Sequence, residues 1–171
     1  MKLEGERIYL KPMSVKHAEI FMKWVNDPDV NKYMVGIKPP KKVEEEIEWV
    51  EKIQKDPNEE VWSIFIKENN KLIGNVGFHE LDNPDGNLRI GIVIGEKDEW
   101  GKGYGTDVFK VATKYLKEEK GAVKVNLTCH VNNIGAHKVY KKSGFKVKGK
   151  QKAFNEIKKK DEDMDYMELD V

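Results

Sequence analysis

Residues 100–106 read Trp-Gly-Lys-Gly-Tyr-Gly-Thr, and this stretch decides the fold. The residues before it, 88–94, are apolar on both faces toward their end, as a central strand is. After it, apolar residues recur at helical spacing between positions 104 and 119. A glycine-rich turn between a strand and a helix lets a phosphate approach the unpaired N–H groups at the start of the helix. The stretch therefore predicts a phosphate-binding loop.

Two familiar phosphate loops do not fit these residues. A dinucleotide fingerprint requires G-x-G-x-x-G, whereas the third glycine here, Gly105, comes one residue early. A P-loop requires four residues between its glycines and then Lys-Ser or Lys-Thr. Here five residues separate Gly95 from Gly101, and Lys102 is followed by Gly103. On these residues alone, a tight turn that binds no ligand remains the alternative.

The rest of the chain predicts an α/β fold with a mixed sheet, in a single domain over residues 1–171. No internal repeat or low-complexity linker divides the sequence. Ser14 is a suitable N-cap for a first helix, which stops at Asn26-Asp27-Pro28. The expected strands are residues 7–11, 61–67, 71–79, 88–94, 123–131, 145–149 and 164–171, and the later helices are residues 43–53, 104–119 and 134–143.

The composition is that of a soluble globular protein, with 39% hydrophobic and 36% charged residues. No apolar run approaches the roughly 18 residues that span a bilayer, and the first residues lack the apolar stretch of a secretory signal. The lone Cys129 excludes an internal disulfide, and together these features predict a cytoplasmic protein without membrane contact. Among 31 cationic residues only Arg7 and Arg89 are arginines, which argues against sequence-specific DNA binding.

A second motif occupies residues 133–145, Asn-Ile-Gly-Ala-His-Lys-Val-Tyr-Lys-Lys-Ser-Gly-Phe. Together with the glycine loop it resembles the GCN5-related N-acetyltransferase (GNAT) superfamily. In that family the loop reads Arg/Gln-x-x-Gly-x-Gly/Ala, and the later helix reads Asn-x-x-Ala-x-x-x-Tyr-x-x-x-Gly-Phe. The sequence matches these patterns at Gly103, Gly105, Asn133, Ala136, Tyr140, Gly144 and Phe145.

Trp100 stands where the family pattern has Arg or Gln. A Trp at this position is common in the branch related to the ribosomal-protein N-terminal acetyltransferases (RimJ/RimL-like). The Asn26-Asp27-Pro28 stop and the helix that carries Trp24 also look like that branch. The resemblance extends over residues 7–169 and implies the GNAT acyl-CoA N-acyltransferase fold.

The resemblance implies a binding site for acetyl-CoA, used as a co-substrate. Two central strands, at residues 90–94 and 124–131, would splay apart at a bulge and admit the pantetheine. Asn133 would contact the pantetheine or order its turn, and Lys138, or else Lys141 or Lys142, would meet the 3′-phosphate. The main-chain groups expected to bind are those of Ile92, Val93 and Ile94 for the pantetheine, and those of Trp100, Gly101, Lys102, Gly103, Tyr104, Gly105 and Thr106 for the pyrophosphate.

The transfer needs a neutral amine, a polarised thioester carbonyl and a proton for the leaving thiolate. A main-chain N–H near Val93 would stabilise the oxyanion. Tyr140 is the expected general acid, because a phenol with an ordinary pKa of about 10 lies close to a thiol at about 8.5. Core packing is the alternative role for that side chain. Glu80 is the candidate general base, acting directly or through water, and His79 is a weaker candidate beside it. A solvated residue at the rim is the alternative role for Glu80.

The remaining histidines and the cysteine point to structural roles. The four histidines and Cys129 lack the spacing of metal ligands, so no metal is expected. His130 is expected to be a hydrogen-bonded structural residue, and His137 and His17 to be exposed on helices. Cys129 is expected in the core, since enzymes of this family transfer the acetyl group directly and need no acyl-enzyme.

The acceptor is expected to be a primary amine. Glu44, Glu45, Glu46 and Glu48 fill the first turn and outer face of the helix at residues 43–53, a region that shapes the acceptor pocket in relatives. Their charge would suit a protein N-terminus, a polyamine or an aminoglycoside equally. The sequence leaves a homodimer open. It also leaves open a non-catalytic acyl-CoA-binding regulatory module and, from the Lys-rich residues 141–160, an RNA-associated protein.

Overall fold

The computed structural model describes residues 1–171, and its centre is one mixed sheet of eight strands in the order β1-β2-β3-β4-β5-β6-β8-β7. Only β5 and β6 run parallel; every other neighbouring pair is antiparallel. This confirms the predicted α/β fold with a mixed sheet. The strands are β1 (Leu3–Glu4), β2 (Ile8–Pro12), β3 (Glu59–Ile66), β4 (Leu72–His79), β5 (Asn87–Ile94), β6 (Lys124–His130), β7 (Lys146–Asn155) and β8 (Lys160–Asp170).

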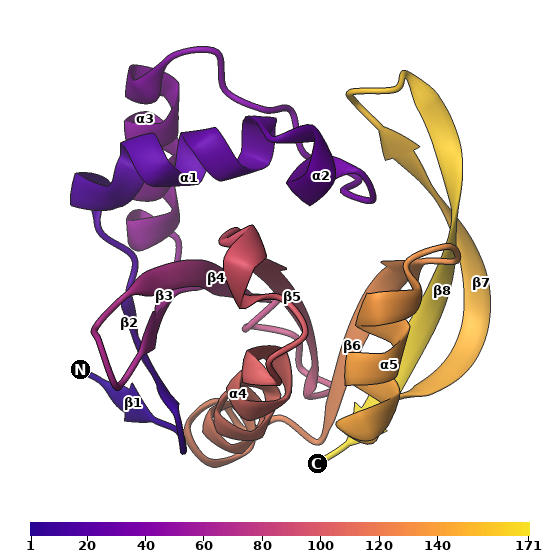
Figure 1. Cartoon of the computed structure of the whole chain (residues 1–171). Helices are drawn as coiled ribbons and strands as arrows, with labels where there is room; N and C mark the ends of the chain where they lie inside the picture. The colour runs from indigo at the N-terminus through magenta and orange to yellow at the C-terminus, as the bar shows by residue number, and fades with distance from the viewer.

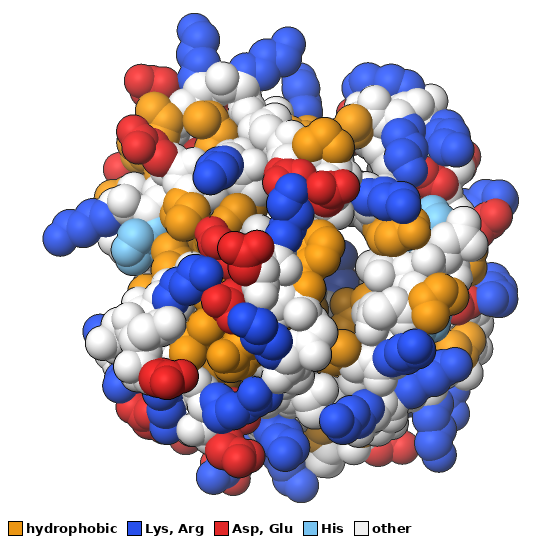
Figure 2. All heavy atoms as spheres, viewed as in Figure 1, with side chains coloured by type: hydrophobic (Ala, Val, Ile, Leu, Met, Phe, Trp, Pro, Cys, Tyr) orange, Lys and Arg blue, Asp and Glu red, His pale blue; other side chains and the backbone are white.

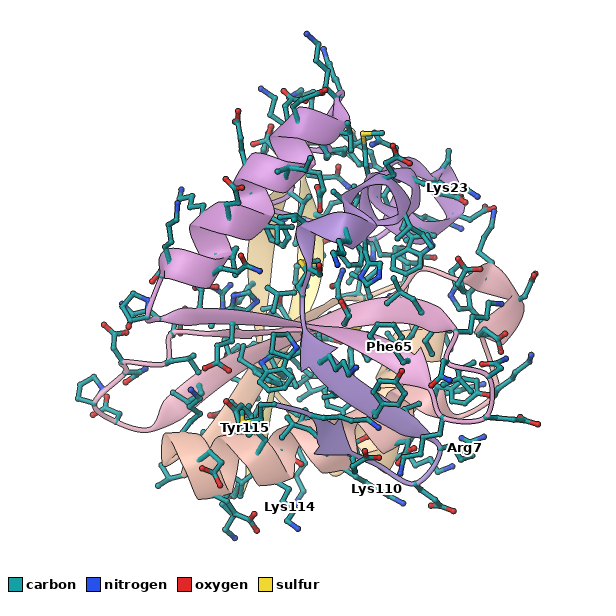
Figure 3. The ribbon with its side chains drawn as sticks, turned by 90° about the vertical axis from the view of Figure 1, so that its left-hand side faces the viewer. Arg7, Lys23, Phe65, Lys110, Lys114 and Tyr115 are labelled. Carbon is teal, nitrogen blue, oxygen red and sulfur yellow. The ribbon has the colours of Figure 1, made fainter.

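Helices cover both faces of the sheet (Figure 1). Seen from the side, α1 and α3 lie above the strands and α4 lies below them (Figure 3). None of the helices combines the length and apolar character that crossing a membrane requires. The helices are α1 (Ala18–Asn26), α2 (Pro28–Asn31), α3 (Val43–Lys55), α4 (Tyr104–Lys120) and α5 (Ile134–Lys142), with short 3-10 turns at Val15–His17 and Lys97–Glu99.

Alternation along the strands gives each face of the sheet its own core. The larger core joins the even-numbered residues of β3 to β5 to α4 and α5, for example Ile64, Ile90 and Val108. The smaller core joins α1 and α3 to the opposite face through Phe21, Trp24, Val50 and Val61. We call the side covered by α4 and α5 the α4/α5 face, and the side flanked by α1 and α3 the α1/α3 face.

The two parallel strands stay together only at their beginnings. β5 and β6 pair from Asn87 to Arg89 on one strand and from Lys124 to Asn126 on the other, and then separate. The splay implied by the family resemblance is therefore present. The implied bulge is not, because β5 runs in continuous register with β4 and β6 in continuous register with β8. We call the separation the fork and the space beyond it the gap.

Local sequence explains most element boundaries. Ser14 accepts a hydrogen bond from the N–H of Lys16, but it caps the 3-10 turn that leads into α1 rather than α1 itself. Helix α1 ends at Asn26 as predicted, and Asp27 then caps the short α2, which the sequence did not predict. Strand β1 was also missed, and β7 and β8 are longer than expected.

Burial corrects three expectations. Glu46 lies on the inner face of α3 with 6% of its surface exposed, not on the outer face. His137 is buried in α5, and its Nε2 lies 2.8 Å from Oδ2 of Asp165, so the expectation of an exposed histidine is wrong. His17 is half-buried between the rings of Phe21 and Phe65.

Candidate active site

The glycine loop opens α4 with a row of free donors. The main-chain N–H groups of residues 101–106 donate no hydrogen bond within the chain, and the first one to do so is that of Asp107, to the carbonyl of Gly103. The N–H of Trp100 already donates to Lys97, so the row starts one residue later than expected. Six unpaired donors at the positive end of a 17-residue helix suit an anion such as a pyrophosphate.

The residues that lead into β2 hold the glycine loop in place. The carboxylate of Asp107, in the first turn of α4, accepts from the N–H groups of Glu6, Arg7 and Ile8. Nη1 of Arg7 donates to the carbonyl of Lys102, and its guanidinium lies over the ring of Tyr104. Neither contact leaves a local signal in the sequence, because about one hundred residues separate the partners. Arg7 and Asp107 were therefore missed.

The main chain of β5 offers further donors and acceptors to the gap. Gly95 donates to the carbonyl of Ile73 across from it on β4. Hydrogen-bonded pairs alternate along antiparallel strands, so Val93 also bonds to β4, while Ile92 and Ile94 turn their N–H groups to the gap. The carbonyl of Ile94 is already occupied by the indole of Trp100, at 2.8 Å. The free N–H groups at this edge of β5 are thus those of Ile92 and Ile94, and the N–H of Val93 is not among them.

Tyr140 lies on α5, in the core of the α4/α5 face. Its ring packs edge-on against Phe109, and only 9% of the residue is exposed. Its hydroxyl makes no hydrogen bond within the chain and is not among the fully enclosed polar atoms that lack a partner, so it keeps contact with solvent. Burial, and secondarily the nearby Cys129, raises the pKa of Tyr140 above its ordinary value. The phenol therefore stays protonated at neutral pH, in the form that donates a proton.

A cysteine, a histidine and an aspartate lie in line beside Tyr140, but they do not form a nucleophile. Sγ of Cys129 lies 3.4 Å from Nδ1 of His137, whose Nε2 binds Asp165. Burial, followed by the charge of Asp165, raises the pKa of Cys129 to about 12, which keeps the thiol protonated. His137 also lies 2.9 Å from the carbonyl of Asn133 and so fixes the start of α5.

Asn133 orders the turn before α5. Its side chain accepts from the N–H of Ala136 at 3.2 Å, as an N-cap does. His130 is buried at the end of β6, where its Nε2 lies 3.1 Å from Glu162 and its Nδ1 accepts from Asn132. The expectation of a hydrogen-bonded structural histidine is consistent with these contacts. No group of three or more metal-ligating side chains comes together in the chain.

Exposed lysines lie on the α4/α5 face, on one side of the gap. The surface is hollowed between β5 and β6, and Lys and Arg side chains gather below this hollow, around α4 and α5 (Figure 2). Lys138, Lys141 and Lys142 are all exposed on or just beyond α5, as a contact to a terminal phosphate requires. The side chain of Lys102 instead binds Glu99 at 2.9 Å.

On the α1/α3 face, a polar pocket of about 290 Å³ lies beside the joined ends of β5 and β6. Glu80 contributes to its wall, but the side chain is half exposed and lies 3.4 Å from Nε of Arg89. Asn126 and Asn87 share a hydrogen bond of 2.7 Å in the same wall. The lining residues are Glu80, Asn83, Asn87, Arg89, Asn126, Thr128, Gln151 and Tyr166.

The forked parallel pair, the free amides that open a helix beyond it and the phenol on the next helix together define an acyl-CoA N-acyltransferase architecture. The chain matches the model of the acetyltransferase (GNAT) domain over residues 7–146 and belongs to this family. Whether it belongs to the RimJ/RimL-like branch stays a prediction.

Two relatives illustrate the range of similarity. An uncharacterized protein of Methanocaldococcus jannaschii is 32% identical over 147 residues, which is 84% of this chain and 29% of that protein. The uncharacterized N-acetyltransferase p20 of Bacillus licheniformis is 29% identical over 116 residues, which is 66% of this chain and 64% of that protein. The chain thus spans less than two thirds of either relative.

Solved structures share the fold over nearly the whole chain. A domain from Methanocaldococcus jannaschii has a TM-score of 0.78 at 28% identity, covering 98% of this chain and 100% of that one. A GNAT-family acetyltransferase from Bacillus anthracis has a TM-score of 0.83 at 22% identity, covering 99% and 98%. Spermidine N-acetyltransferase from Vibrio cholerae, solved with CoA and spermine, has a TM-score of 0.84 at 20% identity, covering 95% of both chains.

Proposed function

We propose that this chain is an acetyl-CoA-dependent N-acetyltransferase that acetylates a primary amine. The row of six free main-chain N–H groups at residues 101–106, at the open end of the gap, carries the proposal. A diphosphate satisfies such a row at a helix start, and an extended pantetheine suits the unpaired edge of β5 beyond the fork. The proposal takes residues 1–171 as one domain, because the single sheet runs from Leu3 to Asp170.

In the proposed reaction the amine attacks the thioester directly. The N–H of Ile92 points into the gap and would stabilise the oxyanion, a contribution typically worth about 3 kcal/mol. Tyr140 would protonate the departing thiolate of CoA, and its unpartnered hydroxyl supports that role. The protonated thiol of Cys129 supports direct transfer over an acyl-enzyme route. Either His79 or Glu80 would take the proton that the amine loses.

For the acceptor, we propose a molecule with one amine and several hydrogen-bonding groups, such as a protein N-terminus. The polar pocket holds a single carboxylate, Glu80, and Arg89 already pairs with it. Its amide and hydroxyl groups match a peptide main chain better than they match a polycation. A small polyamine is the competing acceptor, since a spermidine acetyltransferase shares the fold.

The test combines binding and turnover. Titration with acetyl-CoA should show association, and a panel of peptides and polyamines should release free thiol. Mass spectrometry of products from a cell extract would then identify the acceptor. Binding of acetyl-CoA without turnover of any amine would instead indicate a non-catalytic acyl-CoA-binding regulatory module. If acetyl-CoA does not bind at all, both the N-acetyltransferase and the regulatory module are excluded.

A further inference from the structure

His79 and Glu59 form a pair on the α1/α3 face. A bulge at Ile64/Phe65 shifts the register of the hairpin by one residue, so Glu59 lies directly opposite His79. Nδ1 of His79 contacts a carboxylate oxygen of Glu59, and the two side chains are 26% and 23% exposed. Because the carboxylate fixes the proton on Nδ1, Nε2 is the nitrogen that carries a free lone pair.

The free nitrogen lies over two glycines beside the fork. A Cβ built on Gly77 would stand 2.7 Å from Nε2, and one built on Gly91 would stand 3.8 Å away. Gly91 is the second residue of β5 after the last one paired with β6, Arg89. The absence of side chains at both glycines lets the imidazole lie against the sheet where the gap begins. Nε2 has no hydrogen-bond partner in the chain.

The charged groups around His79 leave it free to act. Arg89 lies directly opposite it on β5, but pairs with Glu80. Glu59 is thereby left to His79, and Glu80 already has a partner and is half exposed. Of the two bases expected from the sequence, His79 is thus the one with a free, oriented acceptor atom beside the gap.

We propose that His79 is the general base of the acetyl transfer and that Glu59 is its positioning residue; the assignment rests on the proposed function. The lone pair of the amine forms the C–N bond to the acetyl carbon, and the C–S bond breaks with its electrons left on sulfur. Nε2 of His79 takes the proton that the nitrogen loses, and Tyr140 gives its phenolic proton to the thiolate. Exchange with solvent restores both groups.

The two groups act from opposite faces of the sheet. Tyr140 belongs to the core beneath α4 and α5, whereas His79 shares the face of Val61, against which α1 and α3 pack. An amine that arrives over Gly91 would therefore meet its base on its own side of the gap, and the thiolate would meet its acid on the other. This separation prevents a direct proton transfer from the phenol of Tyr140 to the imidazole of His79.

The test is kinetic and uses the full chain with an amine that the wild type accepts. His79→Gln should lower kcat about 10²-fold and leave the dissociation constant of acetyl-CoA unchanged. It should also abolish the fall in kcat toward low pH that protonation of a catalytic base produces. Added imidazole should restore part of the rate to His79→Ala, a readout that a structural role would not move.

Two further variants sharpen the result. Glu59→Gln should lower kcat less than His79→Gln, because the imidazole remains and loses only the carboxylate that fixes its tautomer. His17→Gln is the matched control, since His17 contacts Phe21 and Phe65 away from the fork. It should keep the wild-type rate and pH profile.

The outcomes separate this proposal from the one it rests on. If His79→Gln keeps the wild-type kcat and pH profile, or if Glu80→Gln is the variant that loses the fall, His79 is not the base. The wild-type turnover measured in the same assay would then still support the N-acetyltransferase. A wild-type chain that turns over no amine would overturn both.

Discussion

Nη1 of Arg7 donates to the carbonyl oxygen of Lys102 at 2.9 Å, across 95 residues of sequence. The bond crosses from the start of β2 to the middle of the glycine loop, and it turns the peptide plane that presents the N–H of Gly103. The same guanidinium lies 4.8 Å from the centre of the Tyr104 ring. Arg7 thus fixes the loop geometry from the side opposite to the free amides.

Arg7→Ala should weaken the binding of acetyl-CoA about tenfold, because the free N–H groups lose their preorganised direction. Isothermal titration measures the affinity, and circular dichroism checks that the fold persists. Lys110→Ala is the control, since it removes one cation from the exposed side of α4, away from the loop (Figure 3). Equal losses in the two variants would mean that net charge, not loop geometry, governs the affinity.

Gly103→Ala should impair the same site through the main chain. Gly103 has φ +84°, and a Cβ there would lie 2.9 Å from Nη2 of Arg7. The left-handed conformation alone costs a non-glycine residue about 1–2 kcal/mol, and relief would displace either the loop or Arg7. We expect a lower Tm and at least about tenfold weaker acetyl-CoA binding.

The matched control for this substitution is Gly135→Ala. Gly135 lies in α5, where an added Cβ meets no atom within 4 Å. An alanine in an exposed helical position should raise stability by up to about 1 kcal/mol. An equal loss of affinity in Gly135→Ala would contradict the role assigned to Gly103.

The sequence correctly predicted the helices and strands in which the spacing of apolar residues matches the buried positions. Helix α4 was predicted from apolar residues at positions 104, 108, 111, 112 and 115, and of these Val108, Ala112 and Tyr115 are buried. The extensions of β7 and β8 were missed because their residues are mostly charged and exposed and do not alternate between apolar and polar side chains. Glu46 was misplaced although it lies four residues before Val50, so helix geometry alone assigns it to the inner face.

The candidate site divides in the same way. The glycine loop and Tyr140 belong to local motifs, so they could be proposed from the sequence. The contacts of Arg7 with Lys102 and of Glu59 with His79 depend on tertiary approach or on strand register. The one-residue bulge at Ile64/Phe65 determines whether Glu59 and His79 share a face. No pattern in residues 59–79 predicts this bulge.

Tyr140→Phe should cut kcat at least about tenfold with little change in acetyl-CoA affinity, because only the proton donor is removed. Thiol release measures the rate, and titration measures the affinity. Tyr9→Phe is the control, since it removes a hydroxyl that binds Asn70 near the hairpin turn. Full activity in Tyr140→Phe would exclude the phenol as the acid.

Asp165→Asn should reduce stability in a pH-dependent way. Lys150, and then His137, holds the pKa of Asp165 below its usual value. A lowered carboxyl pKa stabilises the fold above the unfolded value of about 4, and that contribution is lost as the pH falls below it. The variant should therefore lose about 2 kcal/mol at neutral pH, because an amide cannot replace the charged acceptor of Lys150 and His137, and less in acid.

Chemical denaturation at several pH values measures this effect. Asp163→Asn is the control, because the Lys152–Asp163 pair is exposed and should matter little. A loss from Asp165→Asn that stays constant down to about pH 3 would show that the carboxylate charge is not what stabilises the pair.

Glu46→Gln should have the opposite effect on stability. Burial raises the pKa of Glu46 to about 7, and no group in the chain hydrogen-bonds its carboxylate. Since the folded state favours the protonated form, the wild type loses stability as the pH rises from about 4.5 to about 7. Glutamine removes that dependence and should stabilise the fold by about 2 kcal/mol above pH 7.

The control is Glu48→Gln, on the exposed side of α3, which should change stability by less than about 0.5 kcal/mol at any pH. If both variants gave the same flat profile, burial of Glu46 would not be the source of the pH dependence.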